Sequence, residues 1–425
     1  MFGHANPRPC QAAAEPHYGQ VGERHERITL SSLLKSDAST DSPNSTVLTT
    51  RFMLLVLSSG AYFSGWAMLY PVLPRFVRDE LGGNGVAVGL AVGSYGITSA
   101  LARPFCGRLG DRYGRRMLVI VGMACVSATL AAYLVVHTLV AAFALRLIFG
   151  IFEAAAFVGL ATAAQDLAPE HRRGEAATYL SGSTFIGVAI GPALGNWIWG
   201  IAGYDAVWVS ASLLVLVGML FGLATPSVRA PQGTPRPTTW IHRGAVLPGL
   251  VLGCAIVGYV GYVSFITLLV TERHLAAPGT VFVTYASLIL LLRVFGAKLP
   301  DRVGPLPVAA VAICLLAAGL WVIAAARSAP VLFAGIAVFA CGIAPIFPGL
   351  LSWVVARVPA HERSHAVATF SAFFDLSMAL GGPLVGVVVS IGGEGWGIFA
   401  GGCVALCGLP LLLRLSQRQA PLTLP

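Results

Sequence analysis

LARPFCGRLGDRYG at residues 101–114 and LLRVFGAKLPDRVG at residues 291–304 are two versions of one stretch, separated by 190 positions. Seven positions are identical in the two copies, and an Asp-Arg pair is among them. Each copy follows one apolar segment and precedes another. An internal repeat over such a distance indicates that the chain consists of two related halves.

The composition of the chain is that of a protein embedded in a lipid bilayer. Of its 425 residues, 56% are hydrophobic and 11% are charged, and the mean hydropathy is +0.79. Soluble domains carry about 25% charged residues, so no soluble fold would hide this much apolar surface. Duplicated halves in so apolar a chain are typical of transporters.

The net charge and the cysteines exclude other classes of partner. The net charge is +9, but the basic residues lie in short segments between apolar runs, where they are signals of membrane topology and do not indicate nucleic acid. The eight cysteines form no CxxC pair, and seven of them lie in or beside apolar segments. We interpret them as small apolar residues and expect neither a disulfide framework nor a metal site.

Apolar segments long enough to cross about 30 Å of hydrocarbon predict twelve transmembrane helices. The predicted fold class is an all-α membrane protein with two pseudo-symmetric six-helix halves, residues 51–225 and 244–415, joined by the polar linker 226–243. We expect residues 1–50 to be a disordered tail and residues 416–425 to be a second tail. The predicted spans are 52–74, 84–105, 117–136, 139–165, 176–199 and 206–225, then 244–270, 279–299, 306–326, 329–355, 366–390 and 396–415.

The distribution of Lys and Arg predicts that both termini are cytoplasmic. With the N-terminus inside, the cytoplasmic segments hold 20 of the 27 basic residues and the outside loops hold four. An excess of basic residues marks the cytoplasmic side of a membrane protein. No cleavable signal peptide is visible, so we expect a multi-pass protein of the inner (cytoplasmic) membrane.

GRLGDRYGRR at residues 107–116 resembles the signature loop between the second and third helices of the major facilitator superfamily (MFS). A plain positive-inside anchor is the alternative, but an anchor does not need an aspartate and two glycines at fixed spacing. Asp111 can cap or pair at a helix terminus. The matching positions are Gly107, Leu109, Asp111, Arg112, Gly114, Arg115 and Arg116.

The resemblance implies a cytoplasmic gate that is closed in one state of the protein and open in another. Asp166, at the end of the fourth span, resembles the acid that pairs with the loop arginines, here Arg112 or Arg115. In the second half, Asp301 corresponds to Asp111 and Arg302 corresponds to Arg112.

Three further motifs resemble motifs of the family, and those in spans one and five resemble its drug:proton antiporter and sugar-efflux-like branch. Small residues let helices approach closely and proline kinks them, so we expect the span-five helix to pack against the other half and to seal the periplasmic side. The motifs are Gly65 to Pro74 in span one, Arg146 and Gly150 in span four, and Gly187, Gly191, Pro192 and Gly195 in span five, which Gly382 and Pro383 echo in span eleven.

Three ionisable residues lie deep in the spans and are functional candidates because charge is expensive there. Glu153 lies two turns after Arg146 on the same face of span four, and Asp375 lies near the middle of span eleven. A carboxyl group at that depth can hold a proton near neutral pH, so we expect proton and substrate coupling here. The alternative is that the acids are ordinary interhelical hydrogen-bond partners. Arg103 and Arg293 lie at predicted span ends, and we interpret them as snorkelling or gate residues.

The resemblance covers residues 51–415 and implies a transporter that works by alternating access. We expect a monomer that exports a small organic molecule in exchange for protons, without ATP or another cofactor, since no GxxxxGK[ST] motif occurs. The same fold could also import by symport, and a non-transporting sensor or scaffold is the alternative from another class. Aromatic residues could line the cavity, namely Tyr62, Trp66, Tyr70, Tyr95, Tyr259, Tyr262 and Phe374.

The sequence HERSH at residues 361–365 fits the zinc-protease pattern H-E-x-x-H. It lies in a short loop before span eleven, and the first half has the related sequence PEHRRGEA at residues 169–176. No third ligand is evident, so we interpret the pattern as part of the repeat and not as a metalloprotease site.

Overall fold

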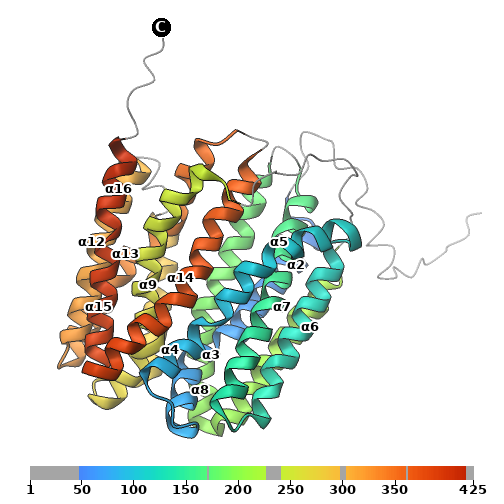
Figure 1. The fold of residues 1–425 in the computed structure, drawn as a ribbon. Coiled ribbons are helices and arrows are strands. Elements are labelled where there is room, and N and C mark those ends of the chain that lie inside the picture. The colour runs from blue at the N-terminus through green and yellow to red at the C-terminus, as the bar shows by residue number, and fades with distance from the viewer. Residues whose placement is uncertain (1–46, 170–171, 226–240, 297–302, 360–361, 418–425) are drawn as a thin grey trace, which may run out of the picture. The chain divides into compact units, whose positions relative to one another are not determined.

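The computed structural model describes residues 47–169, 172–225, 241–296, 303–359 and 362–417. Within these ranges every regular element is a helix, and the long helices run side by side (Figure 1). The first half contains α2 (Thr50–Ala67), α3 (Leu69–Arg75), η1 (Phe76–Glu80), α4 (Gly85–Gly93), α5 (Tyr95–Tyr113), α6 (Arg115–Ala131), η2 (Ala132–Val135), α7 (Leu139–Leu167) and α8 (Arg173–Gly222). The second half contains α9 (Arg243–Glu272), α10 (Pro278–Gly296), α12 (Pro305–Ala325), α13 (Ala329–Ala356), α14 (Arg363–Gly392), α15 (Glu394–Leu406) and α16 (Gly408–Gln417).

The described helices supply all twelve predicted spans. Ten stretches are long and apolar enough to cross a membrane, and α10 contributes a shorter apolar helix. One of the ten is α8, which contains two spans because its backbone turns at Gly203. The all-α fold with two six-helix halves is therefore confirmed.

The duplication is visible in the backbone as well as in the sequence. Gly114, between α5 and α6, and Gly304, directly before α12, are 190 positions apart and have φ angles of 95° and 97°. Gly203 and Gly393, again 190 positions apart, have φ angles of 77° and 85° at the last turn of each half. Only glycine adopts such angles without strain, so the repeat preserves the residues that the turns require.

The two ends of the helix bundle carry different connections. At one end α2 begins, α8 gives way to α9, and α16 ends; we call this the linker end, and it is uppermost in Figure 1. At the other end, called the far end below, η1 leads into α4 and α14 leads into α15.

The halves approach each other most closely between α4 and α14. A Cβ atom added at Gly89 would lie 2.0 Å from the carbonyl oxygen of Gly382, and one added at Gly85 would lie 2.8 Å from that of Gly386. Real Cβ atoms do not come so close, so the two backbones touch because neither helix has side chains there. This glycine seam runs from the far end towards the middle of the bundle.

The span-five glycines pack differently from the prediction. Cβ atoms added at Gly191 and Gly195 would lie 2.5 Å from Ser64 O, on α2, and 2.4 Å from O of Met68, the residue that directly follows α2. Gly187 faces the same helix. The expectation that these glycines make the contact with the other half is therefore wrong, because α2 of the same half offers small residues at the matching spacing; α8 meets α10 of the other half through a different face. The motif prolines Pro192 and Pro383 lie inside α8 and α14, respectively, and Gly382 is the motif glycine that reaches the other half.

Candidate functional site

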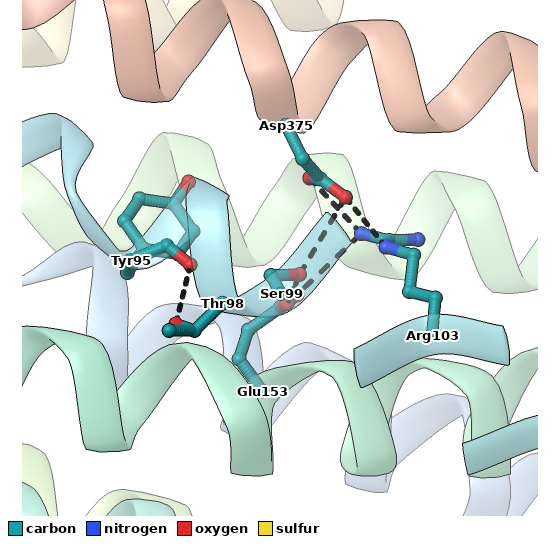
Figure 2. A network of polar contacts seen from close by, with 6 residues as sticks. All are labelled: Tyr95, Thr98, Ser99, Arg103, Glu153 and Asp375. Carbon is teal, nitrogen blue, oxygen red and sulfur yellow. Dashed lines mark hydrogen bonds and ion pairs between the residues drawn. The ribbon is translucent and has the colours of Figure 1, made fainter. Parts of the chain in front are cut away.

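An ion pair joins the two halves near the middle of the bundle (Figure 2). The Nε atom of Arg103, on α5, lies 2.5 Å from Oδ2 of Asp375 on α14, and Nη2 of Arg103 donates to Oδ1 of Asp375 at 3.1 Å. The Nη2 contact is a hydrogen bond, whereas the Nε contact is a close ion pair without hydrogen-bond geometry. The close approach of the helices permits it, since a Cβ atom at Gly96 would lie 2.2 Å from the carbonyl oxygen of Asp375.

A second carboxylate belongs to the same cluster. The Ser99 hydroxyl donates to Oε2 of Glu153, on α7, at 2.6 Å and lies 3.5 Å from Oδ2 of Asp375. A hydroxyl has one proton to donate, so Ser99 binds Glu153 in this arrangement. Nη2 of Arg103 lies 3.9 Å from Oε2 of Glu153, so one arginine serves both acids.

Burial makes the charge balance of this cluster important. Glu153 is 4% exposed, Asp375 is 2% exposed and Ser99 is fully buried. The Arg103 guanidinium also lies 4.4 Å from the centre of the Phe157 ring. Two carboxylates and one guanidinium leave an excess negative charge, which is unfavourable in a buried site. Binding of one proton would therefore make the cluster electrically neutral.

The snorkelling interpretation of Arg103 is wrong. The predicted span ended at residue 105, whereas α5 continues through the signature loop to Tyr113. Arg103 consequently lies deeper in the bundle, and its side chain is 15% exposed. Ser99, one turn earlier, was missed altogether. The signal that could have drawn attention to Arg103 is its repetition as Arg293, whose side chain is outside the described part of the chain.

Arg146 lies apart from the carboxylate cluster. Its Nε and Nη2 atoms donate to the carbonyl oxygens of Ala91 and Val92 at 2.8 and 2.9 Å. These carbonyls lie at the C-terminus of α4, where a helix carries partial negative charge. The guanidinium also lies 4.6 Å from the Tyr95 ring centre and 4.8 Å from that of Phe149. Of the three predicted coupling residues, the structure brings Glu153 and Asp375 together and places Arg146 elsewhere.

At the linker end, an ion pair joins α6 to α7. Nε of Arg115 lies 3.3 Å from Oδ2 of Asp166, whereas the Arg112 guanidinium lies over the Tyr113 ring. Gly107 lies inside α5, and Gly114 separates α5 from α6. The Asp111 side chain, Asp301 and Arg302 are outside the described part of the chain, so the rest of the expected gate is not seen.

Two arginines at the far end reach across the halves. Arg78 of η1 forms an ion pair with Glu394 at the start of α15. Arg75 of α3 is 4% exposed, and it donates to Asn196 Oδ1 at 3.1 Å and to Thr271 Oγ1, on α9, at 3.4 Å. The sequence placed both arginines in an outside loop, but helix continues through η1 to Glu80 and buries Arg75.

The H-E-x-x-H residues contact the linker end of α9. Oε2 of Glu362 lies 3.0 Å from Nε2 of His242, and the rings of His242 and His365 meet edge to face at 5.6 Å between centres. His361 is outside the described residues. In the part of the chain that the structure describes, no group of three potential metal ligands occurs.

Comparisons with known proteins agree with this architecture. The family model described as Major Facilitator Superfamily matches residues 55–278 and 254–425. The chain is 29% identical over 389 residues to an uncharacterized MFS-type transporter of Salmonella typhimurium, covering 88% of this chain and 100% of that one. It is 30% identical over 373 residues to another from Burkholderia pseudomallei, covering 83% of this chain and 88% of that one.

A solved structure has the same fold. The crystal structure of a bacterial homolog to the human lysosomal transporter Spinster, in an inward-facing and unoccupied conformation, matches with a TM-score of 0.72. The match covers 86% of this chain and 96% of that chain at 14% sequence identity. At this identity the likeness concerns the fold alone.

Proposed function

Since the chain belongs to the major facilitator superfamily, we propose that it is a proton-coupled secondary transporter that exports a small organic molecule by alternating access. Membrane transport follows from the family, and the coupling proposal rests on one observation. The buried pair of Arg103 and Asp375 ties α5 of the first half to α14 of the second, with Glu153 as a second acid on the same arginine.

In the proposed cycle, protonation weakens the Arg103–Asp375 ion pair that connects the two halves. Protonation of Asp375 removes the charge that Arg103 holds across the seam, and Arg103 then retains Glu153 as its acidic partner. Because α5 and Glu153 belong to the first half and Asp375 to the second, the halves become freer to rock against each other. Loss of the proton restores the tie.

The direction of transport is proposed from the resemblance of the span-five pattern to that of antiporters. Gly187, Gly191 and Gly195 hold α8 tightly against α2, so this half would move as a rigid unit. Rigid halves suit an exporter, which must not leak protons or substrate through its centre. The proposed partners are thus a small-molecule substrate, protons and the lipid bilayer, with a monomer as the working unit.

We place the protein in the inner membrane with both termini and the linker in the cytoplasm. The bias of basic residues supports this orientation. In a cysteine-free background, an impermeant thiol reagent added to intact cells should label a cysteine at residue 83 and miss one at residue 230. Labelling of residue 230 from outside would contradict the orientation.

Inside-out membrane vesicles test the function directly. With an acidic lumen, vesicles that contain the transporter should accumulate its substrate, found by screening a compound library against empty vesicles. Depletion of the same compound from preloaded vesicles under this gradient would contradict export and support proton symport. If no compound responds to the gradient, the coupling proposal fails.

A further inference from the structure

We infer that the transported molecule carries a carboxylate group, which binds to Arg146 and Trp66 on the far-end side of the carboxylate cluster. This inference deepens the proposed function by naming a substrate class. The two residues face a narrow gap between α2, α3, α4 and α7, which is closed in this conformation and has no room for a water molecule. The gap is lined by Trp66, Leu69, Tyr70, Leu73, Val92 and Arg146.

Arg146 brings to this gap a positive charge that has no carboxylate partner among the described residues. The residue is 2% exposed, and two of its nitrogens are occupied by the α4 carbonyls. The third, Nη1, has no hydrogen-bond partner among the described residues, and no carboxylate described there lies within ion-pair distance of Arg146. Buried charges in proteins are normally paired, so an anion is the missing partner.

Trp66 supplies a second donor of the same kind. It is 5% exposed, and within the described residues its Nε1–H has no acceptor. The hydroxyl of Tyr62, one turn earlier on α2, is likewise buried without a described partner. Arginine and the indole N–H can only donate, so the ligand group that fits them must only accept. An ionised carboxylate has this property, and its planar oxygens suit a guanidinium.

The walls of the gap indicate what the carboxylate is attached to. Leu69, Leu73 and Val92 are apolar, and the rings of Trp66 and Tyr70 meet at 5.2 Å between centres. A small flat or apolar body matches such walls.

The gap also communicates with the second half. Tyr70 belongs to α3, which packs against α9 of the second half, so a molecule beside Tyr70 lies close to both halves. A ligand in that position can be presented to either side as the halves rock.

A purely structural role for Arg146, as a cap on α4, is the alternative that the experiment must separate. Trp66→Phe does so because it removes one N–H, keeps an aromatic ring and leaves the α4 cap intact. Trp208→Phe is the matched control: Trp208 is also buried, its Nε1 also lacks a described partner, and it packs against Phe76 and Tyr133 away from the gap.

The test is equilibrium binding of benzoate, phenylacetate and cinnamate, each against its primary amide, to the purified full-length transporter in detergent. We expect at least one acid to bind more tightly than its amide. Trp66→Phe should weaken that acid about 10-fold, as expected for one hydrogen bond to a charged group, and Trp208→Phe should leave its affinity unchanged. Arg146→Gln should remove the preference for the acid.

Two results would overturn the inference: amides that bind as well as their acids, or an acid preference that survives in Trp66→Phe at full strength. The assay uses no pH gradient, so it can fail while gradient-driven flux of another compound succeeds. Conversely, acid-selective binding without gradient-driven flux would support this site and contradict the proposed coupling.

Discussion

Two of the seams between the halves are related by the duplication, yet they are built differently. In the α4–α14 seam the backbones touch, and a Cβ atom at Gly89 would lie 2.0 Å from the carbonyl oxygen of Gly382. In the α8–α10 seam, Asn196 occupies the position equivalent to Gly386, and its side chain faces Gly279, the equivalent of Gly89. One seam is thus in direct backbone contact, whereas a side chain separates the other.

The buried charges follow the same asymmetry. At an offset of 190, Asp375 corresponds to Phe185 and Glu153 to Ile343. Arg146 corresponds to Ile336. Both halves therefore have the same helical framework, but Glu153 and Arg146 occur only in the first half and Asp375 occurs only in the second. The tight seam lies beside the carboxylate cluster, since a Cβ atom at Gly96 would lie 2.2 Å from the carbonyl oxygen of Asp375.

The largest expected effect comes from removing the cation of the cluster. Arg103→Gln leaves two buried carboxyl groups without their positively charged partner. It should lower the free energy of unfolding by roughly 3–5 kcal/mol. The equivalent Arg293→Gln should have a much smaller effect, because the counterparts of the two acids are apolar. Reversible denaturation in mixed micelles measures both variants, and similar losses at the two positions would contradict a one-sided cluster.

A double variant sharpens this comparison. Arg103→Gln combined with Asp375→Asn leaves one fewer unpaired charge than Arg103→Gln alone, so it should be the more stable of the two. If the effects of the single substitutions simply add, the two residues do not interact and the ion pair has no energetic significance.

The seams themselves should respond unequally to one methyl group. Gly89→Ala forces the α4 and α14 backbones apart and should destabilise the protein by about 1–3 kcal/mol, with a loss of transport. Gly279→Ala meets the end of the Asn196 side chain, which can rotate away, so its effect should be smaller. Melting temperatures and flux for both variants at matched expression decide the matter; a greater loss at Gly279 would reverse the assignment of the seams.

The smallest effect is expected at the linker end. Asp166→Asn breaks the ion pair with Arg115. Because this pair is partly exposed, the free energy of unfolding should change by less than about 1 kcal/mol. Because salt screens such pairs, the difference from the unsubstituted protein should shrink further in concentrated salt. A large loss that is insensitive to salt would show that Asp166 has a deeper structural role.

Much of the fold was predictable because apolar segments and a repeat can be recognised in the sequence without knowing which helices contact each other. Twelve apolar segments and a repeat at 190 positions were sufficient for the architecture. The partner of the span-five glycines was not predictable in the same way. Gly191 has the spacing that permits a close helix contact, but the spacing does not say whether α2 or a helix of the other half makes that contact.

The sequence predicted only part of the candidate site, because it does not show which helices contact each other. Glu153 and Asp375 stand out because acids are rare in apolar spans. Arg103 and Ser99 do not, because their importance depends on the extension of α5 and on how closely α14 approaches. Arg146 was correctly recognised as buried, but its contacts with the α4 carbonyls depend on a break between α4 and α5 that hydropathy does not reveal.

Flux through Asp375→Asn in inside-out vesicles tests most directly whether a proton on the Arg103–Asp375 cluster drives transport, as we propose. Asn mimics the protonated carboxyl and cannot release a proton. The variant should therefore lose accumulation driven by an acidic lumen, yet still exchange labelled for unlabelled substrate across the membrane. Accumulation equal to that of the unsubstituted protein would contradict the claim and show that protons are carried elsewhere.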